Sequence, residues 1–270
     1  MEQMTPRERV MAILRGEAPD RPPVALWRHF YEAEQRAQGM AEAMLAFQRR
    51  YRWDFLKVNP RASYHAEGWG LRVQYSGDPL QPPRPVEWPV KQPGDWLALC
   101  PLSPFTGVLG EHLEALTTIS QGLKGEVPFV MTLFSPLSIA SRLAPSEEVF
   151  LQHLREAPEK VQYALEDITE TFVAFAKECL ARGADGLFFA TTVWASASRL
   201  TPKEYGRWGR PYDLRVLQAA GGAPFTILHI CRERAFFDLL ADYPVACVNW
   251  DTSAPGNPSL LQGFERLKAA

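Results

Sequence analysis

The sequence has few cysteines and no long hydrophobic run. Its four cysteines are scattered and do not form the pattern of a disulfide framework, so we expect a reducing, cytoplasmic environment. No apolar stretch approaches the roughly 20 residues of a membrane span, and the start lacks the apolar core of a signal peptide. The net charge of −2 creates no field that would recruit nucleic acid or an anionic membrane. We therefore expect neither a nucleic-acid nor a membrane partner.

Short apolar runs alternate with longer segments of helical periodicity along most of the chain. Parallel strands joined by right-handed helical crossovers produce this alternation. No glycine-rich phosphate loop follows a strand, which weakens a doubly wound sheet as the alternative. The alternation predicts one α/β domain over residues 1–270 with about six parallel strands and a loop or hairpin insertion at about 59–103. The polar residues that follow several strands favour a (β/α)8 TIM-barrel type of fold, of which about six strands would be present. The six predicted strands are 21–28, 54–58, 127–133, 186–190, 225–229 and 245–249.

The helical segments carry clear start signals in several places. Thr5-Pro6-Arg7-Glu8 and Thr201-Pro202-Lys203-Glu204 each combine a threonine N-cap, a proline at the first helical position and a glutamate three residues after the cap. We expect the main helices at about 32–51, 105–122, 136–143, 146–154, 158–182, 233–242 and 258–268.

Polar residues follow several strands, and one pair stands out. His229 and Cys231 lie two residues apart at the end of the fifth predicted strand, so their side chains point to the same face. An imidazole and a thiolate in this arrangement supply half of a zinc site. A buried cysteine beside a hydrogen-bonded core histidine is the structural alternative.

The segments at the strand ends resemble the uroporphyrinogen decarboxylase family, which includes zinc-dependent corrinoid methyltransferases. The resemblance runs through most of the chain, in the expected order. It rests on Arg21-Pro22-Pro23-Val24-Ala25-Leu26-Trp27-Arg28, Asp54-Phe55-Leu56-Lys57-Val58, Ser135-Pro136-Leu137-Ser138-Ile139-Ala140-Ser141, Leu200-Thr201-Pro202-Lys203-Glu204-Tyr205 and Arg210-Pro211-Tyr212.

The resemblance implies a decarboxylase that removes acetate carboxyl groups from a tetrapyrrole without a cofactor. In that case Arg28 binds substrate carboxylates and Asp54 stabilises the positive charge that develops on the pyrrole. Arg142 takes the position of the family's active-site tyrosine, and His229 contacts the substrate. The second arginine of the family's first-strand signature is absent here. Arg28 in a surface ion pair, and Asp54 paired with a neighbouring cation, are the structural alternatives.

The same resemblance implies a second chemistry, in which a zinc-bound thiol accepts a methyl group from a corrinoid. His229 and Cys231 are then metal ligands, and the family's third ligand would lie beyond Ala270. Cys247, the only downstream cysteine, suits the core of the sixth strand better. A barrel that binds a tetrapyrrole or corrinoid without turnover is the third hypothesis.

Either enzyme acts on a small molecule, and decarboxylation is the narrowly preferred prediction. A sheet of six strands would expose two hydrogen-bonding edges. We therefore expect a homodimer, or other segments of the chain that cover the exposed edges.

Overall fold

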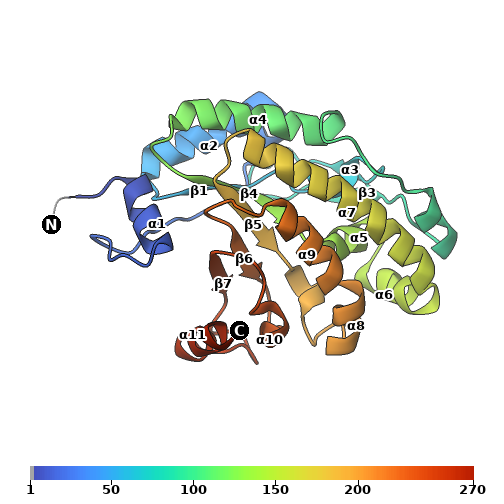
Figure 1. Cartoon of the computed structure of the whole chain (residues 1–270). Coiled ribbons are helices and arrows are strands. Elements are labelled where there is room, and N and C mark those ends of the chain that lie inside the picture. The colour runs from blue at the N-terminus through green and yellow to red at the C-terminus, as the bar shows by residue number, and fades with distance from the viewer. Residues whose placement is uncertain (1–2) are drawn as a thin grey trace.

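A five-stranded parallel sheet forms the centre of the computed structural model, which describes residues 3–270. The strand order is β1-β4-β5-β6-β7, so neighbours in the sheet are also successive in the chain once the insertion is set aside. The sheet is the partial (β/α)8 arrangement expected from the sequence (Figure 1). Its strands are β1 (Leu56–Val58), β4 (Phe129–Phe134), β5 (Gly186–Ala190), β6 (Ile227–Ile230) and β7 (Cys247–Trp250).

Long helices cover the outer face of the sheet, with α2, α4, α7 and α9 side by side (Figure 1). The predicted threonine caps are confirmed, because Thr5 opens α1 and Thr201 opens α8 with a capping box each. The helices are α1 (Pro6–Leu14), α2 (Ala37–Tyr51), α3 (Tyr64–Glu67), α4 (Gly107–Leu123), α5 (Pro136–Leu143), α6 (Glu147–Glu156), α7 (Pro158–Ala181), α8 (Pro202–Trp208), α9 (Arg210–Ala219), α10 (Phe237–Leu240) and α11 (Leu260–Ala269), with 3-10 turns at Ala33–Gln35, Pro93–Ala98 and Thr192–Ala195. No helix of the described residues is long and apolar enough to cross a membrane.

Side chains alternate across the central strands and build two cores. One side of β4 and β5 packs against the helices, and its residues, such as Leu133 and Phe189, belong to the large core. The other side forms a smaller cluster of Val10, Val130, Phe188, Phe225 and Ile227. Period-two alternation places these two sets on opposite faces. The second face is the one that points to the interior of a barrel.

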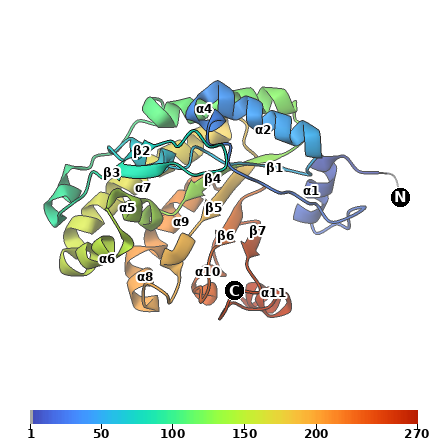
Figure 2. The ribbon, with the colours of Figure 1, turned by 180° about the vertical axis from the view of Figure 1, so that it is seen from behind.

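The insertion contains the predicted hairpin. Strands β2 (Arg72–Gln74) and β3 (Arg84–Glu87) pair antiparallel. Figure 2 shows this hairpin at the same end of the molecule as α5 and α6, opposite the end that holds α1. The carboxyl ends of the strands face the hairpin end, because β1 leads directly into the insertion.

Two predicted elements are wrong. Residues 21–28 run extended beside β1 but form no strand. One backbone bond joins the two segments, from Asp54 N–H to Val24 O (2.9 Å), whereas Val24 N–H donates to the Asp54 carboxylate (2.7 Å) and Pro23 has no N–H. The predicted helix at 233–242 is reduced to α10, since Arg232 and Arg234 adopt left-handed backbone angles (φ 74° and 51°).

Candidate functional site

A cavity of about 1060 Å³ lies where the strands end. Each strand of the sheet sends a residue to its wall from its carboxyl end or from the loop that follows. These residues are His65 after β1, Phe134 of β4, Thr192 after β5, Cys231 after β6 and Asp251 after β7. Barrels of parallel strands hold their active sites at this edge. The volume is at the upper end of the range for small-molecule pockets, so a large ligand fits.

His229 is held in one orientation at the carboxyl end of β6. Its ring stacks on Phe188 with the centroids 5.0 Å apart, and its Nδ1 lies 2.6 Å from Oδ1 of Asn249 on the neighbouring strand. Because an amide oxygen accepts, Nδ1 carries the proton and Nε2 keeps its lone pair. Burial lowers the pKa of His229; the bond to Asn249 raises it and the charge of Lys57 lowers it. A neutral imidazole with a free Nε2 results.

Cys231 follows β6 and lines the cavity, whereas His229, two residues earlier in the strand, is not among the residues of the cavity wall. Burial raises the pKa of its thiol, the charge of Arg232 lowers it and Asp251 raises it again, with a net increase. The backbone of Arg232 is left-handed, as is that of Thr192 (φ 51°) on the next loop. Non-glycine residues seldom adopt this conformation, and it is concentrated at functional sites.

The zinc hypothesis requires a third protein ligand. Within residues 3–270, no group of three histidine, cysteine or acidic side chains has the geometry to hold a metal ion. Cys247, the other downstream cysteine, lies in β7 against the small core. His229 and Cys231 have the side-chain chemistry of zinc ligands, but among residues 3–270 no third group joins them in a metal site.

The cavity also has a cationic side. Arg142, in the last turn of α5, lines it, and no carboxylate of the described residues lies within 4.0 Å of its guanidinium. Arg199 lines the same cavity but is paired with Glu147 (2.7 Å). The predicted substrate-binding residue Arg142 is thus an unpaired cation in the wall.

Arg28 lies outside the residues that line the cavity. Its Nε donates to the carbonyl of His29 (3.1 Å), and its guanidinium lies 5.2 Å from the ring of Phe30. The neighbouring His29 does line the cavity and pairs with Glu34 (3.1 Å). The predicted carboxylate ligand Arg28 is therefore exposed and outside the cavity wall, although its neighbour Trp27 packs on Phe188 (centroids 5.3 Å apart).

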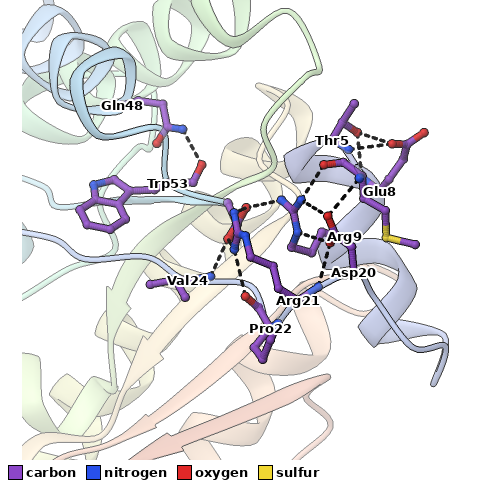
Figure 3. A network of polar contacts seen from close by, with 11 residues as sticks. Thr5, Glu8, Arg9, Asp20, Arg21, Pro22, Val24, Gln48 and Trp53 are labelled. Carbon is purple, nitrogen blue, oxygen red and sulfur yellow. Dashed lines mark hydrogen bonds and ion pairs between the residues drawn. The ribbon is translucent and has the colours of Figure 1, made fainter. Parts of the chain in front are cut away.

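Asp54 lies at the opposite edge of the sheet, in a network of ion pairs. Its carboxylate accepts from Arg9 Nη1 (2.6 Å) and from Arg21 Nη1 (2.5 Å), in addition to Val24 N–H. Figure 3 shows Arg9 reaching from α1, and Arg21 from the following segment, into this network, which Asp20 extends. Burial favours a raised pKa for Asp54, but these hydrogen bonds outweigh it and lower the pKa. Asp54 anchors the N-terminal segment to the sheet.

The strand register shows how far this network is from the cavity. His229 pairs with Ala190, and Ala190 pairs with Phe134. Phe134 lies three residues beyond Met131, the partner of the last residue of β1. His229 is therefore level with position 61, seven residues beyond Asp54, or roughly 23 Å along the strand direction. The register therefore places Asp54 far from His229, at the opposite edge of the sheet.

Sequence reasoning missed two residues near the site. Lys57 is buried in β1, with Nζ bonded to Asn59 and lying 4.5 Å from the ring of Phe188, on which His229 stacks. Burial lowers the pKa of Lys57 to about 7. His65 lines the cavity from α3. The signal for Lys57 was a lysine inside an apolar strand, whereas His65 lies in an insertion without a recognisable pattern.

A parallel sheet whose neighbouring strands succeed one another in the chain, with helices over its outer face and a cavity at its carboxyl edge, has the arrangement of (β/α)8-type proteins. A model of the family Uroporphyrinogen decarboxylase (URO-D) matches residues 5–258. The chain belongs to this family, as its strand-end segments predicted.

The relatives include both proteins named as methyltransferases and a protein named as a decarboxylase. The chain is 25% identical over 245 residues to a protein of Methanosarcina acetivorans named methylcobamide:CoM methyltransferase MtbA, covering 86% of this chain and 71% of the relative. It is 29% identical over 196 residues to a uroporphyrinogen decarboxylase of Syntrophotalea carbinolica, covering 67% of this chain and 56% of the relative. A solved methyltransferase from Methanosarcina mazei superposes with a TM-score of 0.78 at 21% identity, over 91% of this chain and 76% of that one. This last likeness concerns the fold.

Proposed function

We propose that the protein transfers a methyl group from a methylated corrinoid to a thiol, with His229 and Cys231 at the reacting end of the cavity. The observation that carries this proposal is the placement of the His229–Cys231 pair. The two residues are two positions apart at one strand end; Cys231 lines the cavity, and His229, which does not line it, is held through Nδ1 by Asn249 just below. The two MtbA relatives, named methylcobamide:CoM methyltransferase, support the same chemistry.

The chain's own residues suit binding and orientation of the two substrates. A neutral His229 with a fixed tautomer acts as a ligand or hydrogen-bond acceptor at one defined point. The Cys231 thiol, whose pKa is raised by burial, stays protonated at neutral pH. Zinc, when bound, lowers the pKa of a coordinated thiol. Because the described residues provide only two ligands, we assign no step to the metal.

Decarboxylation, the reaction preferred from the sequence, has less support in the geometry. It required Arg28 and Asp54 in the pocket, and neither lines it. Asp54 has its carboxylate engaged by two arginines, and Arg28 contacts its own neighbours. Of the residues predicted for that reaction, Arg142 lines the cavity, whereas Arg28, Asp54 and His229 do not. The decarboxylase relative remains the reason to measure this activity directly.

The test measures both reactions on the same preparations. Purified protein is incubated with methylcobalamin and coenzyme M, and loss of the methyl–cobalt absorbance and formation of the thioether are followed. We expect Cys231→Ser and His229→Ala to lower methyl transfer at least 100-fold, and Arg28→Ala to leave it within twofold. Asn249→Leu removes the partner of His229 Nδ1 and should reduce the rate about 10- to 100-fold.

The result that would contradict methyl transfer is also specific. Carbon dioxide release from uroporphyrinogen that survives Cys231→Ser, with no demethylation of methylcobalamin, would overturn the proposal. Metal analysis of the same samples by mass spectrometry gives an independent readout of the pair. If His229 and Cys231 are ligands, zinc content falls in both variants and not in Cys247→Ser.

A further inference from the structure

His65 and Arg142 line the cavity from the β4 side, and the proposed chemistry uses neither. The His65 ring packs on Phe134 at the end of β4, with centroids 4.6 Å apart. Cys231 follows β6, and β5 lies between the two strands. The two sides of the cavity are thus separated by two strand spacings, or roughly 10 Å. A small molecule can reach both at once.

His65 presents one defined nitrogen to the cavity. The side chain is 5% exposed, and its Nδ1 is shielded from solvent with no hydrogen-bond partner. Burial lowers its pKa to about 3, and Arg142 and His112 contribute to the same direction, so the ring is neutral at physiological pH. A buried N–H without an acceptor is rarer than an acceptor without a donor, so the proton belongs on Nε2. His65 then offers an N–H donor toward the cavity.

Arg142 adds a permanent positive charge to the wall of the same cavity. It is exposed to the cavity and lacks a carboxylate partner in residues 3–270, unlike Arg199 with Glu147 in the same wall. A guanidinium has five donors and no acceptor, and it binds planar oxyanions in a bidentate manner. The N–H of His65 and the guanidinium N–H groups of Arg142 can all donate to a negatively charged acceptor.

We propose that His65 and Arg142 bind an oxyanion of the substrate, a carboxylate or a sulfonate, and so fix which end of the molecule faces Cys231. The proposal depends on the proposed function only in taking this cavity as the substrate site. It assigns a positioning role to both residues. The neutral part of the substrate then extends across the end of β5 toward β6.

The experiment uses small probes without a methyl donor or added metal, so its result does not depend on turnover. Propionate and propane-1-sulfonate are titrated into the full-length protein, with 1-propanol as the neutral control. Long-range ¹H–¹⁵N spectra of histidine-labelled protein report on the two nitrogens of His65. We expect an Nε2-protonated ring in the free protein and a saturable shift of the Nε2 signal with an anion, absent with 1-propanol.

Variants distinguish a specific anion-binding site from nonspecific electrostatic attraction of the anion. Arg142→Gln should weaken anion binding at least about 10-fold, and Arg199→Gln, the matched control, should change it less than twofold. His65→Phe should weaken binding about 3- to 10-fold, and His65→Gln, which keeps an N–H, should restore part of the loss. The stronger of the two anions identifies the substrate class as carboxylate or sulfonate.

Three outcomes would overturn the proposal. They are an Nδ1-protonated His65, equal losses in Arg142→Gln and Arg199→Gln, or equal shifts with 1-propanol and propionate. If the anions bind as expected but methyl transfer is absent, the subsite stands and the proposed function fails.

Discussion

The sharpest prediction concerns Asp54, which the sequence places in catalysis and the structure places in the scaffold. Replacing Asp54 by asparagine removes a charge that accepts hydrogen bonds from Arg9, Arg21 and the Val24 amide. The side chains of Arg9 and Asp54 are each 2% exposed, so the pair is fully buried. We expect Asp54→Asn to destabilise the fold while leaving the chemistry of the surviving folded protein intact.

The magnitude follows from the contacts. Hydrogen bonds to a charged group contribute about 1.5–3 kcal/mol each, but bonds that share one carboxylate are not additive. Arg9 keeps its second partner, Asp20 (2.6 Å), and asparagine can still accept one bond. Removing one partner of a buried ion pair costs about 3–5 kcal/mol. We expect a loss in this range.

The assay is urea unfolding followed by tryptophan fluorescence and by circular dichroism, whose coincidence tests the two-state assumption. Asp242→Asn is the matched control, because its ion pair with Arg210 (2.6 Å) is partly exposed; surface pairs contribute less than about 1 kcal/mol. The pH dependence adds a second readout. The lowered pKa of Asp54 means that its stabilisation is complete above the unfolded value near 3.9 and is lost as the pH falls below it. The loss of stability at low pH should therefore be smaller in Asp54→Asn than in the wild type.

The reasoning would be refuted by a variant that unfolds within about 1 kcal/mol of wild type and yet loses more than 100-fold in turnover or ligand binding. That result would place Asp54 beside the substrate despite the roughly 23 Å that the register gives.

Two further predictions use residues nearer the cavity. Lys57→Met should stabilise the protein below pH 7, by about 1–4 kcal/mol, because a charged amine is buried without a carboxylate; urea unfolding from pH 6 to 10 checks this. The pKa of Lys57 is lowered to about 7 from about 10.4 in the unfolded chain. The free energy of unfolding of the wild type should therefore rise as the pH increases from about 7 to about 10.4. A difference in this free energy between the two proteins that stays constant over the same pH range would contradict the prediction. Arg28→Ala should change probe binding by less than twofold, measured beside Arg142→Gln, since Arg28 does not line the cavity and its guanidinium engages the carbonyl of His29 and the ring of Phe30. A loss equal to that of Arg142→Gln would contradict this prediction.

Most of the fold could be predicted because its signals are local. Five of the predicted strands are apolar runs bounded by caps and glycines, and β1, β4, β5, β6 and β7 form there. Residues 21–28 failed because strand formation depends on hydrogen bonding to a neighbour. Pro23 lacks the donor, and the Val24 amide binds a carboxylate instead. Sequence pattern records the apolar alternation but not this competition.

The candidate site was less predictable, for a geometric reason. A residue at the start of a strand and one at its end look alike in a sequence, but they lie at opposite edges of a parallel sheet. Asp54 precedes β1, whereas His229 and Cys231 end β6. The family resemblance supplied roles for both sets and could not show that this chain uses Asp54 in an ion-pair network.

The two edges of the sheet differ in how their charges are satisfied, and this difference indicates which edge binds substrate. At the amino edge, Arg9, Arg21 and Asp54 satisfy one another within the protein. At the carboxyl edge, Arg142 has no ion-pair partner among the described residues, His65 has a shielded nitrogen without a bond, and His229 keeps Nε2 free. Unsatisfied polar groups cost folding free energy unless a ligand or water engages them. Buried atoms without a partner also occur at the amino edge, at Gln48 Oε1 and Trp53 Nε1, so the distinguishing feature of the carboxyl edge is the charge of Arg142, unpaired within the described residues, in the wall of the cavity.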